Sequence, residues 1–252
     1  MEVEVKSGKR ISVVMPTYNG ERFIELQISS ILSQLGKNDE LIISDDGSTD
    51  GTIRLIGNFK KMDSRVRVLR GPGRGVIANV SNALAAAEGK YIFLADQDDY
   101  WEPGKVKKML TAFAKTHAPL IVHDATVVTA NGSGIIAPSF FATKNCHAGY
   151  LRNIIRNSYI GCCMAFRREI LKYALPIPED IKMHDQWIGM VAEALAKGKA
   201  GAGKCRKPVF FASKLIKYRR HSANVSSMKH DPALKMILYR LRLIINLRSR
   251  GL

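Results

Sequence analysis

The chain of 252 residues has few cysteines, and their spacing argues against a disulfide framework or a zinc site. The four of them, Cys146, Cys162, Cys163 and Cys205, form no C-x-x-C pair. The adjacent pair fits small buried apolar side chains better. No apolar run approaches the length of a membrane span, and the first ten residues are not followed by the apolar segment of a secretory signal. These absences predict a cytoplasmic protein.

Acidic residues are also scarce, since 22 Asp and Glu stand against 39 Lys and Arg, a formal net charge of +17. Such a charge favours nucleic acid, an anionic membrane surface or phosphate-rich substrates as partners. Nucleic acid is the weakest of these, because the chain lacks both a recognition-helix pattern and basic residues interleaved with aromatics. We therefore expect no nucleic-acid partner.

Strand-like apolar runs alternate with helix-like segments in the first hundred residues. We expect strands over residues 10–15, 40–44, 66–69 and 91–95, and helices over 20–35, 53–61 and 76–88. This order predicts an α/β fold with a mostly parallel sheet flanked by helices. Farther along, the predicted elements are helices over 105–115 and from Asp185 onward, and strands over 120–128, 160–166 and 208–211.

A cluster of carboxylates, Asp96, Asp98 and Asp99, follows the fourth predicted strand. Ligands of parallel α/β sheets bind at the carboxyl ends of the strands, where polar residues gather in this sequence. Carboxylates placed together repel one another and are costly to desolvate, so the cluster predicts a divalent cation that also binds substrate phosphates. Capping of the following helix is the alternative, but one aspartate suffices for that.

Several motifs occur in the order found in a known enzyme family. They are P-T-Y-N at 16–19, D-D-G-S-T-D-G-T at 45–52, D-Q-D-D-Y-W at 96–101, M-H-D-Q-W at 183–187 and Y-R-R-H-S-A-N-V at 218–225. Together they resemble the family 2 glycosyltransferases, and the D-Q-D-D-x-W and H-D-x-W forms resemble the bacterial rhamnosyltransferase-like branch. The resemblance implies a GT-A (Rossmann-like) fold, a nucleotide-diphosphate sugar donor, Mg²⁺ or Mn²⁺, and inversion of the anomeric centre.

The resemblance also implies roles for individual residues. Asp98 is expected to bind the metal directly, with His221 as a further metal contact, while Asp99 shapes the site. Either Asp45 or Asp46 reads the nucleobase, and the other organises the turn. Residues expected to contact donor or acceptor are Pro16, Thr17, Tyr18, Asn19, Asp45, Asp46, Arg74, Asn79, Asp96, Gln97, Trp101, His184, Trp187, Arg219 and Arg220.

Inverting transfer needs a base that removes the proton of the acceptor hydroxyl. We expect Asp185 to be this catalytic base, with an N-cap of the following helix as the structural alternative. Arg219 and Arg220 would face the pyrophosphate, or else form a basic strand edge in water. The sequence departs from many relatives at Ala78, because they carry an arginine directly before the residue equivalent to Asn79. We expect Arg74, in the preceding loop, to supply that positive charge instead.

Three other functions compete with this interpretation. The loop G-P-G-R-G at 71–75 superficially resembles a dinucleotide-binding fingerprint, but it follows the third strand and its spacing differs. A nucleotidyltransferase would need a basic, glycine-rich phosphate loop early in the chain. A nucleotide-sugar-binding module without catalysis would not need both Asp98 and Asp185.

We expect one large domain in three parts. Residues 1–103 form a nucleotide-sugar-binding half, 104–228 an acceptor-binding and catalytic half, and 229–252 a basic amphipathic helix. That helix fits an anionic membrane interface and equally fits docking on its own domain or on a second copy. The expected reaction moves a sugar from dTDP-rhamnose or a UDP-hexose to a glycan or a lipid-pyrophosphate-linked acceptor, at the inner face of the cytoplasmic membrane.

Overall fold

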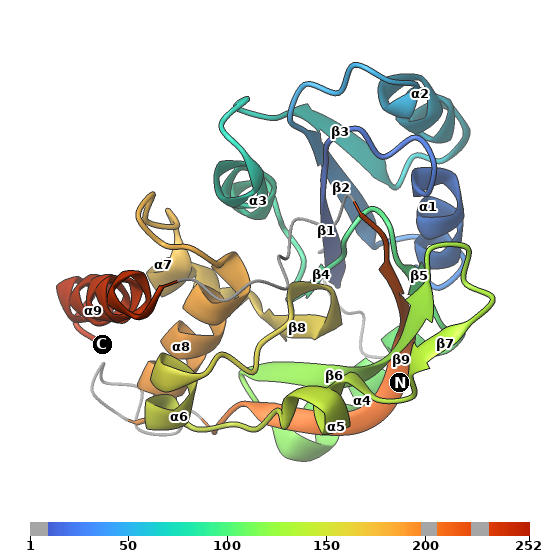
Figure 1. Ribbon diagram of the computed structural model, residues 1–252. Helices are drawn as coiled ribbons and strands as arrows, with labels where there is room; N and C mark the ends of the chain where they lie inside the picture. Colours follow the sequence, from blue (N-terminus) through green and yellow to red (C-terminus); the bar gives the residue numbers. More distant parts are fainter. Residues whose placement is uncertain (1–9, 198–205, 223–231) are drawn as a thin grey trace, which may run out of the picture.

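The computed structural model describes residues 10–197, 206–222 and 232–252, and its first half is a parallel sheet between helices (Figure 1). Four strands lie in the order β3-β2-β1-β4, and all are parallel. One face of this sheet carries α3, and the other carries α1 and α2. The elements are β1 (Ile11–Thr17), α1 (Ile24–Leu32), β2 (Glu40–Asp45), α2 (Thr52–Met62), β3 (Val66–Arg70), α3 (Val76–Ala85) and β4 (Tyr91–Leu94).

The central strand β1 is buried along almost its whole length, as expected for a strand covered by helices on both faces. We expected it to end before Pro16, but it continues to Thr17, with Pro16 opposite Ser44 of β2. Proline lacks an N–H, but Pro16 lies beyond Val14, the last β1 residue paired with β4, so it interrupts no pair between these two strands. The predicted break was therefore wrong by two residues.

The second half extends the same sheet with antiparallel and parallel strands, so the complete sheet is mixed. Its order is β3-β2-β1-β4-β8-β6-β9-β5, with β7 paired to β6. Strand β8 is antiparallel to β4 and β6, whereas β6 and β9 are parallel. The strands are β5 (Tyr100–Trp101), β6 (Leu120–Thr129), β7 (Ile135–Ala137), β8 (Met164–Arg167) and β9 (Val209–Arg220).

Strand β9 shows where sequence patterns were insufficient. The predicted strand over 208–211 is only its beginning, and β9 continues to Arg220 beside β6 and β5. Its later residues mix basic and apolar side chains without strict alternation, and only Leu215, Ile216, Tyr218 and Arg219 are buried. Because of this extension, Arg219 and Arg220 stand on a strand of the main sheet, and the Arg219 N–H reaches Asp99, which follows β4.

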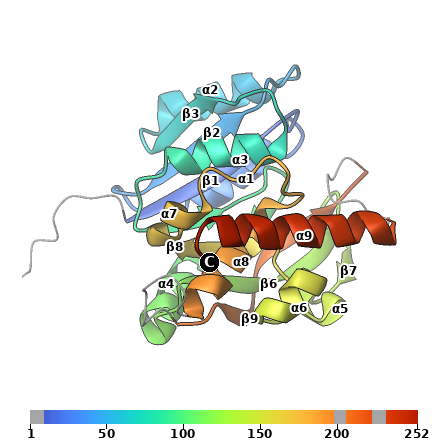
Figure 2. The ribbon, with the colours of Figure 1, turned by 90° about the vertical axis from the view of Figure 1, so that its left-hand side faces the viewer.

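The helices of the second half cover this sheet and form its outer layer (Figure 2). The segment predicted as a strand over 160–166 begins instead with a 3-10 turn at Gly161–Cys163. A second 3-10 turn spans Arg168–Ile170. The helices are α4 (Lys105–Thr116), α5 (Phe140–Lys144), α6 (Tyr150–Ile155), α7 (Leu171–Ala174), α8 (His184–Ala196) and α9 (Ala233–Ser249). Residues 198–205, after α8, and residues 223–225 of the last motif lie outside the described residues.

Helix α9 is docked on the domain through one of its faces. Leu243 and Leu247 are buried, and Arg240 Nη2 donates to the Ile155 carbonyl of α6 at 2.7 Å. At its end, the Arg250 guanidinium donates to the carbonyls of Tyr173, Leu175 and Pro176. Docking on the protein therefore accounts for the inward face of α9. None of the helices in the described residues is both long and apolar enough to cross a bilayer.

Candidate active site

The turn after β2 is held together by the carboxylate of Asp45. Its Oδ2 accepts hydrogen bonds from Thr17 Oγ1 at 2.8 Å and Ser48 Oγ at 2.6 Å. Its Oδ1 accepts from the backbone N–H groups of Gly47 and Ser48 at 3.1 and 2.8 Å. Asp45 is buried, so in the structure it organises the turn and joins it to the end of β1.

The neighbouring Asp46 holds the glycine-rich loop that precedes α3. Its two carboxylate oxygens accept from the N–H groups of Gly73 and Gly75, both at 2.7 Å. Both glycines have positive φ, +68° and +86°, which other residues rarely adopt. Asp46 is half-buried, so of the two carboxylates it is the one with surface that a ligand could still contact.

A side-chain clamp joins the loops that follow β1 and β4. Gln97 Oε1 accepts from the Tyr18 N–H at 3.0 Å, and Gln97 Nε2 donates to the Tyr18 carbonyl at 2.9 Å. A Cβ at Gly20 would lie 2.3 Å from Gln97 Oε1, so a larger residue there would displace the Gln97 amide. The Tyr18 ring is 57% exposed, and Asn19 Oδ1 accepts from Thr49 N–H at 2.9 Å. The predicted P-T-Y-N residues thus form a fixed rim with one aromatic face open.

The carboxylates that follow β4 lie close to one another and form the acid cluster of the candidate site. The ligand atoms of Asp96, Asp99 and Cys162 all lie within 4.8 Å of one another. Asp98 points to the end of β9, where its Oδ2 lies 2.8 Å from His221 Nε2. The structure thus brings the two predicted metal ligands, Asp98 and His221, into contact. It also adds Cys162 to the cluster, a residue that no sequence motif pointed to.

Two residues hold the β9 end against these carboxylates. The Arg219 backbone N–H donates to Asp99 Oδ1 at 3.1 Å, and its guanidinium lies 5.6 Å from the centre of the Phe23 ring. The same ring stacks on His221 at a centroid distance of 4.7 Å. Phe23, at the start of α1, is a site residue that sequence reasoning missed. An aromatic before a helix usually indicates packing.

Burial and mutual repulsion raise the pKa values of two carboxyl groups in the cluster. Burial, and then the charges of Asp98 and Asp185, raise the pKa of Asp96 to about 7. Burial, and then Asp98 and Asp96, raise the pKa of Asp99 well above its ordinary value. A cation at this position would relieve the repulsion. Carboxylate oxygens with a histidine nitrogen suit Mg²⁺ or Mn²⁺, so the residues present fit the predicted metal.

Lys105 supplies the nearby positive charge from within the protein. Its side chain is fully buried, and its Nζ donates to the Cys162 carbonyl at 3.0 Å and lies 3.9 Å from the centre of the Trp101 ring. Burial lowers its pKa to about 8, against the opposing effect of Asp99 and Asp96. A lysine at the first position of an amphipathic helix reads as solvent-exposed, so no sequence signal could have found it.

Asp185 lies in the first turn of α8 and is buried. Its Oδ1 accepts from the Gln186 N–H at 2.6 Å, and it also accepts from the N–H of Gly161. Burial raises its pKa to about 6, and its charge in turn raises the pKa of Asp96. Asp185 therefore faces the acid cluster from the other half of the sheet, at a pKa suited to a base near neutral pH.

His184 is neutral beside it. Burial lowers its pKa to about 4, so it carries no charge at neutral pH. A Cβ at Gly161 would lie 2.9 Å from His184 Nε2, so glycine at the 3-10 turn allows the imidazole to approach. The pair from the predicted M-H-D-Q-W motif is thereby fixed against residues 161–163.

Other predicted contact residues serve the protein itself. The indoles of Trp101 and Trp187 are buried, and Trp187 Nε1 donates to the Ala174 carbonyl at 2.8 Å, so both pack in the core. Asn79 is buried and its Nδ2 donates to the Ser44 carbonyl at 2.8 Å. Arg74 forms an exposed ion pair with Glu179 at 3.0 Å. Its charge reaches the segment before α8 and is open to a ligand.

Arg220 does not enter the cluster. Its Nη1 lies 3.3 Å from the Tyr218 hydroxyl, and its guanidinium lies 5.9 Å from the centre of that ring.

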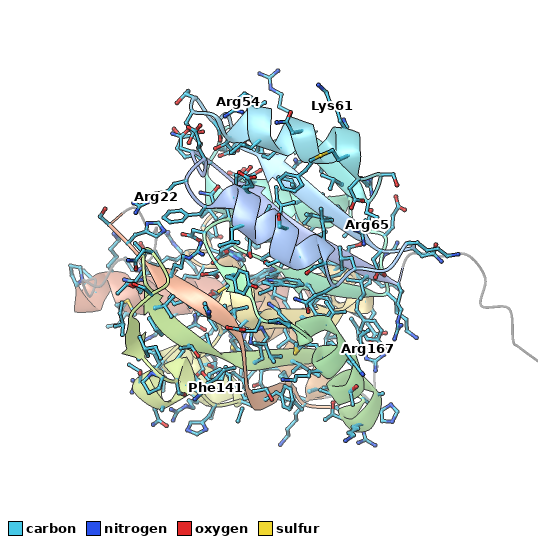
Figure 3. The ribbon with its side chains drawn as sticks, turned by 90° about the vertical axis from the view of Figure 1, so that its right-hand side faces the viewer. Arg22, Arg54, Lys61, Arg65, Phe141 and Arg167 are labelled. Atoms are coloured by element: carbon cyan, nitrogen blue, oxygen red, sulfur yellow. The ribbon has the colours of Figure 1, made fainter. Side chains whose placement is uncertain are left out.

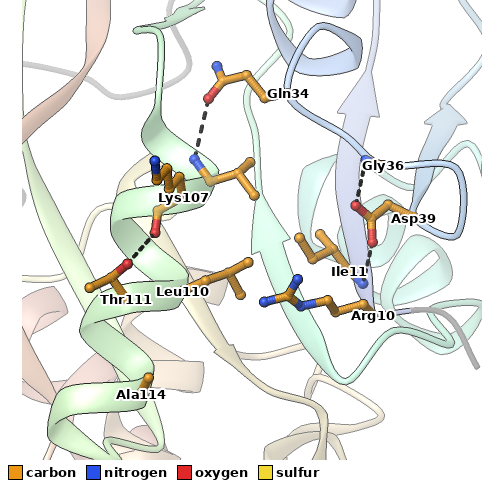
Figure 4. Close-up of a pocket in the computed structure, with 10 residues that line it drawn as sticks. Arg10, Ile11, Gln34, Gly36, Asp39, Lys107, Leu110, Thr111 and Ala114 are labelled. Atoms are coloured by element: carbon orange, nitrogen blue, oxygen red, sulfur yellow. Dashed lines mark hydrogen bonds between the residues drawn. The ribbon is translucent and has the colours of Figure 1, made fainter. Parts of the chain in front are cut away.

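A separate cleft of about 460 Å³ lies at the opposite, amino end of β1, between the loop after α1 and helix α4 (Figure 4). Asp39 there accepts from the N–H groups of Ile11 and Gly36. None of the predicted binding residues lines this cleft.

Comparisons with known proteins agree with this architecture. The chain is 28% identical over 237 residues to TuaG of Bacillus subtilis (strain 168), described as a teichuronic acid biosynthesis glycosyltransferase, covering 89% of this chain and 84% of the relative. It is 29% identical over 153 residues to the UDP-Glc:alpha-D-GlcNAc-diphosphoundecaprenol beta-1,3-glucosyltransferase WfgD of Escherichia coli, covering 60% of this chain and 57% of the relative.

Among solved structures, residues 1–349 of TarS from S. aureus in complex with UDP-GlcNAc superpose with a TM-score of 0.69 at 19% identity. The superposition covers 96% of this chain and 69% of that one, and it supports the predicted GT-A fold. A family model, Glycosyl transferase family 2, matches residues 12–175, a span that begins in β1 and contains the acid cluster. The chain belongs to glycosyl transferase family 2.

Proposed function

We propose that this protein is a metal-dependent inverting glycosyltransferase that moves a hexosyl group from a nucleotide-diphosphate sugar to an acceptor hydroxyl. The observation that carries the proposal is that the acid cluster and the buried Asp185 meet at the same 3-10 turn: Cys162 lies with Asp96 and Asp99, and a Cβ at the adjacent Gly161 would lie 3.8 Å from the Asp185 Cβ. The acid cluster would hold the cation that stabilises the leaving group, and Asp185 would accept the proton of the acceptor hydroxyl.

The donor would lie over the ends of β1, β2 and β3. Tyr18 offers an exposed ring at the rim, and Asp46 is the better candidate for reading the nucleobase, because Asp45 is buried within its own turn. Arg74 extends from the loop that Asp46 holds, so its guanidinium is available to the pyrophosphate once it leaves Glu179. Arg219 holds the backbone of β9 against Asp99 on the other side.

Asp98 and His221 would hold the divalent cation, with Asp96 and Asp99 beside them. The cation, when bound, offsets the negative charge that develops on the leaving nucleoside diphosphate. Within the protein, Lys105 Nζ stays fixed on the Cys162 carbonyl and keeps the buried carboxylates partly compensated. Cys162 contributes a thiol whose pKa burial raises well above its ordinary value, so it remains protonated and donates to the carboxylates.

Asp185 would remove the proton from the acceptor hydroxyl as the hydroxyl attacks the anomeric carbon. The N–H groups of Gln186 and Gly161 fix one orientation of its carboxylate. The lone pairs that accept no hydrogen bond from the protein therefore keep one direction, in which they can take the proton of the acceptor. Neutral His184 adds no charge that would lower the basicity of Asp185. Attack from the side opposite the leaving group gives inversion.

The donor and acceptor classes follow from relatives. WfgD uses UDP-glucose and a diphosphoundecaprenol-linked acceptor, TarS was crystallised with UDP-GlcNAc, and TuaG is named for teichuronic acid synthesis. These support a UDP-hexose donor and a glycan or lipid-pyrophosphate-linked acceptor in bacterial surface polysaccharide synthesis, at the cytoplasmic face of the membrane. The motif forms shared with rhamnosyltransferases keep dTDP-rhamnose as the second donor to test.

A donor panel tests the proposal. The protein is incubated with UDP-glucose, UDP-galactose, UDP-GlcNAc and dTDP-rhamnose, with Mn²⁺ or with EDTA, and release of the nucleoside diphosphate is followed. We expect release from one donor class, dependent on the metal and lost in Asp98→Ala. Binding of a donor without any release, in the presence of a range of acceptors, would favour the non-catalytic binding module, and consumption of a sugar phosphate with a nucleoside triphosphate would favour a nucleotidyltransferase.

A further inference from the structure

Helix α9 has a second apolar face that points away from the protein. Its docked face consists of Leu243 and Leu247, whereas Leu234, Ile237, Leu238, Leu241 and Ile245 are between 46% and 71% exposed. These five recur at three- and four-residue spacing, so they form one stripe along the helix, on the side opposite the docked residues. An exposed stripe of five large aliphatic side chains is unusual on a monomer and indicates a partner.

The neighbouring helix α6 continues the stripe. Leu151 and Ile155 are 71% and 62% exposed, and they are four residues apart on that helix. The two helices are in contact, and Arg240 Nη2 bonds the Ile155 carbonyl at 2.7 Å. Figure 2 shows α6 directly beside α9 on this side of the molecule. The apolar surface of α6 and α9 therefore spans two helices; we call it the α6/α9 surface.

Basic side chains border this surface. Lys235, Arg242 and Arg248 of α9 are exposed, and no acidic residue occurs between positions 232 and 252. Positive charge alone does not select this side of the molecule, because exposed Arg22, Arg54 and Lys61 lie on the opposite side (Figure 3). What distinguishes the α6/α9 surface is the apolar stripe together with the basic rim, the combination that binds anionic bilayers.

We propose that the α6/α9 surface docks on an anionic phospholipid bilayer, with the apolar stripe at the acyl boundary and Lys235, Arg242 and Arg248 among the headgroups. Docking there would bring the membrane close to the proposed catalytic base. Helix α8, which carries Asp185 in its first turn, packs on α9, and Asn246 Nδ2 of α9 bonds Asp180 at 3.0 Å. This inference rests on the proposed function, because a lipid-linked acceptor in that membrane would then lie on the side of the protein where α8 carries Asp185.

Vesicle co-sedimentation of the full chain tests the proposal, using equal parts of phosphatidylglycerol and phosphatidylcholine against phosphatidylcholine alone. We expect binding to the anionic vesicles only. The double variant Leu238→Glu with Leu241→Glu should bind about tenfold more weakly or worse, because it places charges in the apolar stripe. The double variant Lys235→Gln with Arg242→Gln should lose about fivefold per charge.

A matched control is available on the opposite helices. Leu26 and Ile53 are 48% and 49% exposed, close to the 46% and 50% of Leu238 and Leu241, so the pair Leu26→Glu with Ile53→Glu should leave vesicle binding unchanged. Equal binding by the Leu238→Glu/Leu241→Glu variant and the wild-type protein would overturn the proposal. So would a wild-type dimer that ignores vesicles and dissociates in that variant, which would assign the surface to a second copy. Neither donor nor acceptor is present, so the result is independent of transferase activity.

Discussion

Replacing Asp185 by asparagine tests whether Asp185 acts as the base while the acid cluster after β4 binds the nucleotide. Asparagine has nearly the same shape, and its Oδ1 still accepts the hydrogen bond that the Gln186 N–H donates. It cannot accept a proton from the acceptor. A positioned general base typically contributes about 10²- to 10⁴-fold to the rate, so kcat should fall by about that factor. Nucleotide affinity should not change, because the acid cluster is intact.

The pH dependence sharpens this prediction. The pKa of Asp185 is raised to about 6, and the base acts only when ionised. Transfer by the wild-type enzyme should therefore be constant above that pKa and fall about tenfold per pH unit below it. The residual activity of Asp185→Asn should lack this decline.

The assay is nucleoside diphosphate release with a saturating acceptor, measured from pH 5 to 8, with calorimetry for nucleotide binding. Asp180→Asn is the control, since its exposed carboxylate lies shortly before α8 and accepts a hydrogen bond from Asn246 of α9. Wild-type kcat in Asp185→Asn would refute the assignment of the base, and an unchanged decline near pH 6 would assign that pKa to another group.

Two further substitutions test the supports of the site. In Gly20→Ala the added Cβ would lie 2.3 Å from Gln97 Oε1, so the clamp should open, with a loss of about 1–3 kcal/mol in urea unfolding and weaker nucleotide binding. Gly57→Ala, in α2 with open space around it, is the control and should be neutral or stabilising. Lys105→Met should cost about 1–3 kcal/mol by leaving the Cys162 carbonyl unpaired, and Mn²⁺ should raise its Tm more than it raises that of the wild-type protein. An equal Mn²⁺ effect on both would show that Lys105 does not compensate the carboxylates.

Much of the fold was predictable because the first half follows simple rules. Buried parallel strands such as β1 and β2 are continuous apolar runs, and each is followed by a polar turn at the same edge of the sheet. The sequence also predicted Asp98 and His221 as metal ligands, and the structure places them in contact although they are far apart in the chain.

The second half was less predictable, for physical reasons. The second half of β9 carries Lys214, Lys217, Arg219 and Arg220 at irregular spacing, so it lacks the period-two alternation that marks a half-buried strand. Lys105 and Cys162 join the site through a buried lysine and a 3-10 turn, and neither leaves a periodic pattern. Conversely, Trp101 and Trp187 stand in recognisable motifs but pack in the core, since a motif fixes the identity of a residue without fixing its exposure.

The most direct test of the central claim is a calorimetric titration with UDP and with dTDP, in Mn²⁺ and in EDTA. The central claim is that the cluster around Asp98 holds the metal of the leaving nucleotide, while Asp185 acts elsewhere. We expect one nucleotide to bind in Mn²⁺, with affinity reduced at least about tenfold in EDTA or in Asp98→Ala, and unchanged in Asp185→Asn. Equal affinities in Mn²⁺ and EDTA, or wild-type affinity in Asp98→Ala, would contradict it.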